Sequence, residues 1–279
     1  MTKTFNEINS YNDTTLMVVD ALNLAFRYKH ARSHDFAEDY IKVVDSLKKS
    51  YKAGKVIIAC DMGSSSYRKQ IYPEYKQNRA DKYAEQTPEE ALEFELFFEE
   101  FNKTIDLISE KYPVLRFNKV EADDIAAYVV KQITNYNIDE VWLISSDKDW
   151  DLLINENVNR FSYVTRKEVT FDNWNEHYDC TPEQYISIKC LMGDSGDNVK
   201  GVEGIGPKRA AELVKDFGSA LDIVASLPIQ SKYKYIQSLN KHGDTIMLNY
   251  QLMDLVTFCE DALGTDNITQ IDKLLKDYL

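Results

Sequence analysis

Short apolar runs that end in a polar residue are the feature that most constrains the fold of this chain. The run LMVVD ends at Asp20, KVIIACD at Asp61, VLRFN at Asn118 and EVWLISSD at Asp147. The stretches between them have the spacing of amphipathic helices, and near-continuous apolar strands separated by helices indicate a parallel sheet covered on both faces. NRFSYV and EVTF are candidate edge strands. We therefore predict an α/β fold with a central, mostly parallel sheet flanked by helices.

The pattern changes near residue 180. Before it, the second and third strands are joined by about fifty residues, which is long for a crossover. This crossover opens polar and basic, then enters a helix that begins with a capping box of Thr87 and Glu90. A second TPEQ begins another helix at Thr181, and the rest is helical with short loops. We predict a polar N-terminal tail at 1–14, an α/β core at 15–180 and a helical region at 181–279.

Composition limits the compartment and the partners. The 279 residues carry a net charge of −13, which on its own argues against a nucleic-acid partner. No apolar run approaches membrane length and the first residues are polar, so we expect neither membrane insertion nor secretion. The four cysteines have no metal-binding spacing. Reduced thiols and a cytoplasmic location are expected.

Three of the apolar strands end in an aspartate. Ligands of an open parallel sheet bind outside the carboxyl ends of its strands, so Asp20, Asp61 and Asp147 should converge there. The alternative is that each one only forms a turn or caps a helix. Three further motifs, VEADDIAAYVV, SSDKDWD and MGDSGDN, are expected to bring more acids to the same edge: Glu121, Asp123, Asp124, Asp149, Asp194 and Asp197. We leave Asp151 out, because one helical position further on it points elsewhere.

Nine carboxylates at one edge would repel one another unless divalent cations lie among them. Oxygen ligands without His or Cys favour Mg²⁺ or Mn²⁺ over zinc. Nine acids are too many for one octahedral ion, so we expect two ions, and two adjacent ions suit hydrolysis of a phosphodiester. A haloacid-type phosphatase and a response regulator both need further acids at the first strand end. Only Asp20 is present there.

A glycine-rich turn follows the last acids. GVEGIGPKR places three glycines before a helix that starts at Pro207, and such glycines let backbone N–H groups approach a phosphate. The alternative is a tight helix–helix turn with a solvated basic start. The turn matches the hairpin of helix–hairpin–helix elements, which hold duplex by its backbone without sequence preference. Its expected contacts are Gly201, Gly204, Gly206, Lys208 and Arg209.

A second basic segment opens the long crossover. Residues 67–82 carry five basic side chains against two acidic ones, a local charge of +3, with three tyrosines interleaved. Cations and aromatic rings together suit single-stranded nucleic acid, although a solvated loop with buried tyrosines would look similar. RYKHAR, which begins at Arg27, is another basic cluster. Binding depends on the local field, so the acidic total does not exclude nucleic acid.

The motifs VVDALN, PEYKQNR, VEADDIAAY, LISSDKDWD and LMGDSGDNVKGVEGIGPKR occur in the order found in the 5′-nuclease family. Over roughly residues 15–260 the chain resembles bacteriophage flap endonucleases and the 5′-nuclease domain of bacterial DNA polymerase I. The resemblance implies a PIN-like core, a helical arch at about 67–105 and a helix–hairpin–helix at about 185–217 in a duplex-binding region. It also implies cleavage of branched or 5′-ended DNA without sequence preference, in phage DNA replication.

The resemblance also implies roles for single residues. Lys76 and Arg79 would contact the scissile phosphate, Tyr75 would stack near the reacting nucleotide, and Lys189 matches a basic active-site position. Arg27 belongs with the DNA contacts. The cofactors would be two or more Mg²⁺ ions, with Mn²⁺ as a substitute and K⁺ at the hairpin, in a monomer. The first metal would use Asp20, Asp61, Glu121, Asp123 and Asp124, and the second Asp147, Asp149, Asp194 and Asp197.

Two alternatives remain open. A non-catalytic DNA-binding module would keep the hairpin without chemistry, but unused clustered acids only cost stability. A PIN-type ribonuclease would use about four acids on a similar sheet and would normally lack the glycine hairpin. The chain departs from the 5′-nucleases it resembles in being more acidic.

Overall fold

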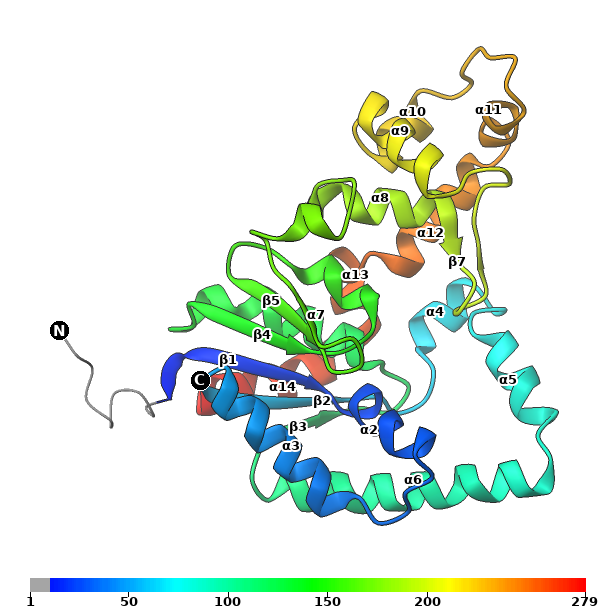
Figure 1. Ribbon diagram of the computed structural model, residues 1–279. Helices are drawn as coiled ribbons and strands as arrows, with labels where there is room; N and C mark the ends of the chain where they lie inside the picture. The colour runs from blue at the N-terminus through cyan, green and yellow to red at the C-terminus, as the bar shows by residue number, and fades with distance from the viewer. Residues whose placement is uncertain (1–10) are drawn as a thin grey trace.

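The computed structural model describes residues 11–279 and contains the predicted sheet. Its six strands lie in the order β3-β2-β1-β4-β5-β6, and every neighbouring pair is parallel except β5 and β6 (Figure 1). The strands are β1 (Asn12–Asp20), β2 (Ala53–Cys60), β3 (Val114–Arg116), β4 (Glu140–Ile144), β5 (Val158–Ser162) and β6 (Lys167–Val169). Both candidate strands are therefore present, but only β6 lies at an edge, since β5 pairs with β4 on one side and β6 on the other. Most of the expected N-terminal tail lies outside the described residues, and Asn12 to Thr14 already belong to β1.

Alternate residues of each central strand enter two different cores. Leu16 and Val18 face one apolar layer, and Met17 and Val19 face the other, which is why the run reads as continuously apolar. One layer lies under three helices: α2 (Ala21–His30), α3 (Ala37–Ser50) and α6 (Pro88–Ser109). The other lies under α7 (Ala122–Gln132), α13 (Leu255–Leu263) and α14 (Thr265–Tyr278).

The last two helices correct the predicted domain division. Residues 181–279 were expected to form one duplex-binding region, but α13 and α14 return to the sheet and cover the face that α7 leaves open (Figure 1). Leu255, Cys259 and Leu263 supply an apolar stripe at helical spacing, and Ile271 and Leu275 continue it. The apolar spacing was visible in the sequence, but it does not show which surface the stripe covers.

The long crossover forms a bow beside the sheet (Figure 1). It comprises α4 (Ser66–Ile71), α5 (Gln77–Ala84) and α6. Thr87 and Glu90 make the predicted capping box at the start of α6. From Phe97 onward this helix buries Phe101, Ile105 and Ile108 against the core, whereas most of its first two turns are exposed. The bow is thus anchored at both ends by apolar packing.

A separate apolar core holds the helical region at about 182–253 together. Its elements are α8 (Pro182–Met192), the short antiparallel strands β7 (Gly193–Asp194) and β8 (Val199–Lys200), α9 (Pro207–Phe217), α10 (Ala220–Ala225), α11 (Lys234–Leu239) and α12 (Gly243–Met253). Three 3₁₀ turns complete the fold: η1 (Ile133–Asn135), η2 (Lys148–Leu153) and η3 (Trp174–Glu176). No helix in residues 11–279 is long and apolar enough to cross a membrane.

Candidate active site

A cavity of about 730 Å³ lies at the carboxyl ends of β1, β2 and β4, beside the base of the bow. Lys76 and Arg79 line it from the bow. Eight of the nine predicted acids line it from the sheet and from the turn after α8: Asp20, Asp61, Glu121, Asp123, Asp147, Asp149, Asp194 and Asp197. Segments far apart in the sequence therefore meet at the edge where the topology predicts it.

The acids at the carboxyl ends of β1 and β2 are each held by hydrogen bonds, and Asp20 is buried whereas Asp61 is half-buried. Asp20 caps α2 by accepting from the Asn23 N–H at 3.2 Å, and it accepts from the Ser145 hydroxyl at 2.7 Å. Asp61 accepts from the Ala122 N–H, 3.1 Å away. Burial raises the pKa of Asp20 well above its ordinary value, and Asp61 raises it further. A nearby cation would stabilise the charged forms of both acids.

The turn after β4 carries the next pair. Asp147 caps η2 by accepting from the Asp149 N–H at 2.9 Å, and its own N–H donates to Ser145 Oγ at 3.1 Å. Asp147 lines the cavity. Desolvation by the surrounding protein raises its pKa to about 6, and repulsion from the Asp149 carboxylate is the next largest cause of the rise. Asp123, across the cavity, accepts from the Trp150 indole N–H at 2.6 Å. Burial and then Asp147 raise the pKa of Asp123.

Glu121 is the most strongly hydrogen-bonded of the eight acids. One oxygen accepts from Lys76 Nζ at 2.8 Å and from the Ser65 N–H at 3.2 Å, and the other from the Tyr75 hydroxyl at 2.9 Å. Arg68 lies 3.4 Å from that second oxygen. Burial raises the pKa of Glu121, but Lys76 and Arg68 outweigh it and lower the pKa to about 2. Glu121 is therefore a fixed anion that anchors the base of the bow.

The base of the bow is also hydrogen-bonded to the turn after α8. The Lys76 N–H donates to the Asp197 carbonyl at 2.9 Å, from a left-handed backbone conformation with φ of 55°. Arg79 donates to the Asp197 carboxylate at 2.6 Å, and Asn78 donates to the Ser195 carbonyl at 2.9 Å. In return Asn198 donates to the Glu74 carbonyl at 2.8 Å. A left-handed lysine is sparsely populated and is maintained here by these contacts.

Lysine ammonium groups stand between the acids. Lys76 Nζ lies 2.8 Å from Glu121 and 3.6 Å from Asp197, and Lys189 Nζ lies 2.5 Å from Asp149 and 3.3 Å from Asp194. Within the described part of the chain, no three acidic side chains alone form a ready coordination shell. The donor set nevertheless fits Mg²⁺, which binds carboxylate oxygen, keeps several waters and needs only one or two protein carboxylates directly.

Two predicted residues have other roles. Asp124 does not line the cavity, since it is fully buried and both its oxygens accept from Arg68, at 2.6 and 2.8 Å. This contradicts its assignment as a metal ligand. Tyr75 is 3 % exposed and its hydroxyl bridges Glu121 and Asp197, each 2.9 Å away. A ring buried in this way cannot stack on a nucleotide, so Tyr75 orients two acids instead.

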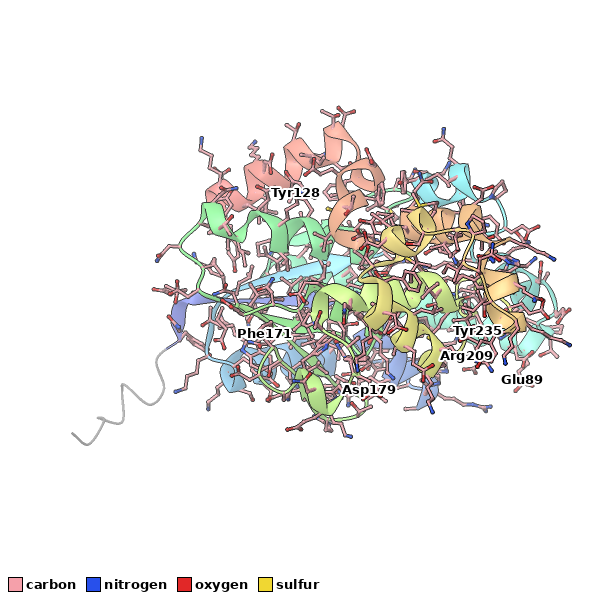
Figure 2. All side chains as sticks on the ribbon, turned by 90° about the horizontal axis from the view of Figure 1, so that it is seen from above. Glu89, Tyr128, Phe171, Asp179, Arg209 and Tyr235 are labelled. Carbon is pink, nitrogen blue, oxygen red and sulfur yellow. The ribbon has the colours of Figure 1, made fainter. Side chains whose placement is uncertain are left out.

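The predicted DNA contacts Arg27, Lys208 and Arg209 do not line the cavity. Arg27 is sandwiched between the rings of Tyr28 and Tyr163, with its guanidinium carbon 4.7 and 4.4 Å from their centroids. Lys208 and Arg209 are exposed at the start of α9. Arg209 donates to the Gly204 carbonyl at 2.6 Å and lies over the Tyr235 ring (Figure 2).

Two of the three hairpin glycines, Gly204 and Gly201, are required by the local backbone. Gly204 has a φ of 81°, the left-handed region that favours glycine. A Cβ at Gly201 would lie 2.0 Å from the Met192 carbonyl oxygen, so Gly201 permits the close approach of two chain segments. A Cβ at Gly206 would meet nothing within 4 Å. Only Gly204 and Gly206 are exposed to a partner.

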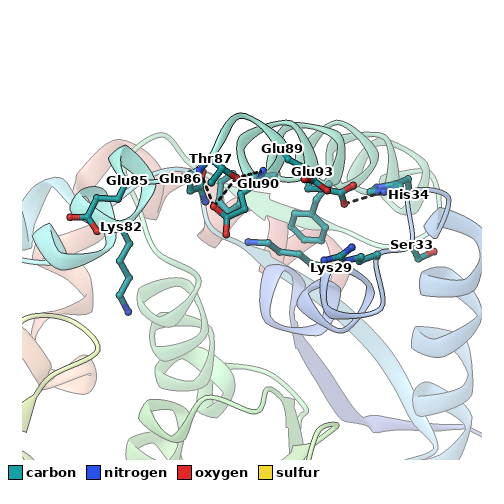
Figure 3. Close-up of a pocket in the computed structure, with 13 residues that line it drawn as sticks. Lys29, Ser33, His34, Lys82, Glu85, Gln86, Thr87, Glu89, Glu90 and Glu93 are labelled. Carbon is teal, nitrogen blue, oxygen red and sulfur yellow. Dashed lines mark hydrogen bonds and ion pairs between the residues drawn. The ribbon is translucent and has the colours of Figure 1, made fainter.

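A second cavity of about 710 Å³ lies between the α2–α3 loop and the start of α6 (Figure 3). Its cationic side comes from Lys29, Arg32 and Lys82. Glutamates of α6 face it, and Glu93 pairs with His34 at 3.2 Å. Glutamates of α6 therefore face three basic side chains across this cavity.

Several site residues could not be found from the sequence. Ser145 and Trp150 lie inside the quoted motif LISSDKDWD, and Arg68 is one of the basic side chains of residues 67–82, but neither residue type nor spacing shows what they contact. Asn78 and Asn198 lie inside the quoted motifs PEYKQNR and MGDSGDNVKG, and that placement was the available signal. Their contacts join the bow to the turn after α8.

A parallel sheet with an acidic carboxyl edge, a bow of helices beside it and an adjacent helix–hairpin–helix together define a 5′-nuclease fold. Two family models match the chain: the N-terminal resolvase-like domain of 5′–3′ exonucleases over residues 15–179 and their C-terminal SAM fold over residues 180–273. The chain belongs to the 5′–3′ exonuclease family.

Individual relatives agree with this membership. The flap endonuclease of Escherichia phage T5 is 45 % identical over 266 residues, which cover 95 % of this chain and 91 % of the relative. A crystal structure of the T5 flap endonuclease in complex with DNA and metal ions superposes with a TM-score of 0.90 at 44 % identity, covering 94 % of this chain and 98 % of that one. DNA polymerase I of Bacillus caldotenax is 30 % identical over 220 residues. The match covers 76 % of this chain and 24 % of that polymerase.

Proposed function

We propose that this chain is a Mg²⁺-dependent flap endonuclease and 5′–3′ exonuclease that hydrolyses phosphodiester bonds in DNA. The observation that carries the proposal is the cavity itself, where eight acids and the cations Lys76 and Arg79 meet between the sheet edge, the bow and the turn after α8. The similarity to the T5 flap endonuclease, crystallised with DNA and metal ions, supports the same conclusion.

The eight cavity acids divide into two groups that would each hold one ion. The first is Asp20, Asp61, Glu121 and Asp123, and the second is Asp147, Asp149, Asp194 and Asp197. When bound, the two ions activate the attacking water and stabilise the departing oxygen. Mn²⁺ would substitute for Mg²⁺, since both accept octahedral oxygen ligands.

The cations of the chain act on the phosphate. Lys76 and Arg79 leave the bow directly above the acids and balance the negative charge of Asp197. Both can donate to the scissile phosphate, where charge grows on the oxygens in the transition state. Lys189 holds Asp149 and Asp194 and supplies positive charge from the opposite side.

The hairpin is proposed to hold the duplex away from the cut. Exposed Gly204 and Gly206, the start of α9, Lys208 and Arg209 offer backbone N–H groups and cations to phosphates. Such contacts carry no sequence preference. K⁺ bound at the hairpin would strengthen them. We further propose that the protein acts as a monomer on branched or 5′-ended DNA, in the cytoplasm of the host cell during phage replication.

A substrate panel tests the proposal. One 5′-labelled flap duplex, its blunt duplex, its single strand and an RNA version are incubated with the protein and Mg²⁺, and the products are separated on a denaturing gel. We expect cleavage near the flap junction and slow removal of nucleotides from free 5′ ends. Binding without cleavage would support a non-catalytic module. Preferential cleavage of RNA would support a PIN-type ribonuclease.

A further inference from the structure

One acid beside the cavity faces away from it. Asp151 in η2 is fully buried, and it is held by Arg160 of β5, which donates to it through both Nε and Nη2. The Nη2 contact measures 2.8 Å. The Tyr178 hydroxyl donates to the same carboxylate. None of the three lines the cavity, so direct binding of metal or DNA does not explain this cluster.

The remaining N–H of the guanidinium leads to the active site. Arg160 Nη1 donates to the Ser145 carbonyl at 2.9 Å, and the Ser145 N–H donates to the Phe161 carbonyl at 3.2 Å. The hydroxyl of the same serine joins two acids, since it donates to Asp20 at 2.7 Å and accepts from the Asp147 N–H at 3.1 Å. Ser145 is thus fixed at its backbone by β5 while its side chain sets the spacing of two cavity acids.

A second chain of contacts leaves the cluster through Tyr178. Its ring lies 4.5 Å from the ring of Tyr185 in α8, and the same helix carries Lys189, which contacts Asp149. Asp151 lies in η2, the turn that Asp147 caps. The cluster therefore joins the turn that carries Asp147 and Asp149 to the helix that supplies their cation.

Stability alone does not explain the cluster. A buried ion pair repays its desolvation poorly, and well-packed apolar residues often serve stability as well or better. The planar guanidinium fork can satisfy a carboxylate and a backbone carbonyl at once, which an ammonium group cannot do in the same geometry. What the pair provides is a fixed direction for the Ser145 carbonyl.

We infer that Arg160, together with Asp151, is the positioning residue that fixes Ser145 and through it the separation of Asp20 and Asp147. The inference rests on the proposed function, because it concerns the acids to which metal is assigned. Groups that orient metal ligands typically change metal affinity or activity about 10–100-fold when they are lost.

The test measures Mn²⁺ affinity by electron paramagnetic resonance, without DNA, for the parental protein and four variants, one of which is the double variant Arg160→Lys with Ser145→Ala. Arg160→Lys keeps the charge that faces Asp151 but loses the fork. Ser145→Ala removes only the bridging hydroxyl and changes no charge. Arg166→Lys is the matched control, since Arg166 lies in the same β-hairpin, is exposed and stacks on the Tyr163 ring at 4.0 Å. The parental protein is the reference.

We expect Arg160→Lys and Ser145→Ala each to weaken Mn²⁺ binding about tenfold or more. The double variant should lose less than the product of the two, because both act through one hydroxyl. Arg166→Lys should match the parent. If Arg160→Lys does not fold, Asp151→Asn replaces it, because it removes the charge that orients the Arg160 guanidinium. Parental Mn²⁺ affinity in the folded variants would overturn the inference, whereas a parental protein that binds no Mn²⁺ would overturn the proposed function instead.

Discussion

Replacing Lys76 with alanine should damage cleavage far more than binding. Its side chain is 12 % exposed and lines the cavity, and its ammonium group lies 2.8 Å from Glu121. A phosphate oxygen bound in the cavity would lie within a few ångströms of this charge. Two unit charges about 4 Å apart at an effective dielectric constant of about 20 interact by about 4 kcal/mol. Because charge grows on the phosphate in the transition state, most of this interaction energy lowers the activation barrier of cleavage.

The expected loss in the cleavage step is about 10²–10³-fold, the usual effect of removing one such donor. DNA binding is shared with Arg79, the hairpin and other cations, so one lost phosphate contact should cost about 1 kcal/mol or less of affinity. The variant should also be less stable in EDTA, by about 3 kcal/mol, because Glu121 and Asp197 lose a nearly buried partner. Mg²⁺ should restore part of that stability.

Single-turnover cleavage of a 5′-flap duplex in Mg²⁺ and its affinity in Ca²⁺ separate the two effects. Lys82→Ala is the control, because Lys82 is exposed on the same bow and does not line the active-site cavity. We expect the control to cleave at close to the parental rate. A Lys76→Ala protein that cleaves at near-parental rate once saturated would remove Lys76 from the chemistry.

Three further predictions follow from the same contacts. Burial raises the pKa of Asp20, Asp123 and Asp147, so the folded protein holds these protons more tightly than the unfolded chain. Without metal, the melting temperature should therefore fall as pH rises from about 4 through 6, the pKa of Asp147, and Mg²⁺ should restore it at pH 7.5. A melting temperature that does not change with pH in EDTA would contradict the electrostatic account. Reversing the charge at Lys208 and Arg209 should weaken duplex binding equally for all sequences and flatten its salt dependence. Filter binding at several salt concentrations measures both effects. Loss of binding for only some sequences would count against backbone recognition. Tyr75→Phe keeps the ring but removes the hydroxyl that bridges two acids, so the cleavage rate should fall while flap affinity stays near parental. A parental cleavage rate in Tyr75→Phe would contradict the bridging role.

The sheet could be predicted because its signal is local. Each central strand is buried on both faces, so it appears as one apolar run, and the aspartate at its end is adjacent in sequence. The parallel topology then brings Asp20, Asp61 and Asp147 together without any knowledge of packing. The capping boxes at Thr87 and Thr181 were equally local and are both present.

The direction of a side chain in the first turn of α7 was harder to predict. Helical spacing places Glu121 and Asp124 on one face, and both do contact the same group, Arg68. That face points to Arg68 rather than wholly to the cavity, while Asp123 points inward. Periodicity gives the face that two residues share, but only the tertiary packing of α4 decides what the face meets.

Burial of Tyr75 and the return of the last two helices depend on long-range contacts. A tyrosine next to a lysine in a basic segment has the same sequence whether its ring is exposed or buried. The stripe of Leu255, Cys259 and Leu263 predicts that α13 packs on something apolar, but not that it packs on the sheet. Both outcomes require the positions of segments more than a hundred residues away.

The most direct test of the two-metal account is the Mg²⁺ dependence of flap cleavage. Single-turnover rates on a labelled 5′-flap duplex are measured from excess EDTA to millimolar free Mg²⁺, with Asp147→Asn as the variant. The account predicts no cleavage in EDTA, a rate that rises more steeply than first order in Mg²⁺, and a shift of that rise to higher concentration in Asp147→Asn. Robust cleavage in excess EDTA would contradict it.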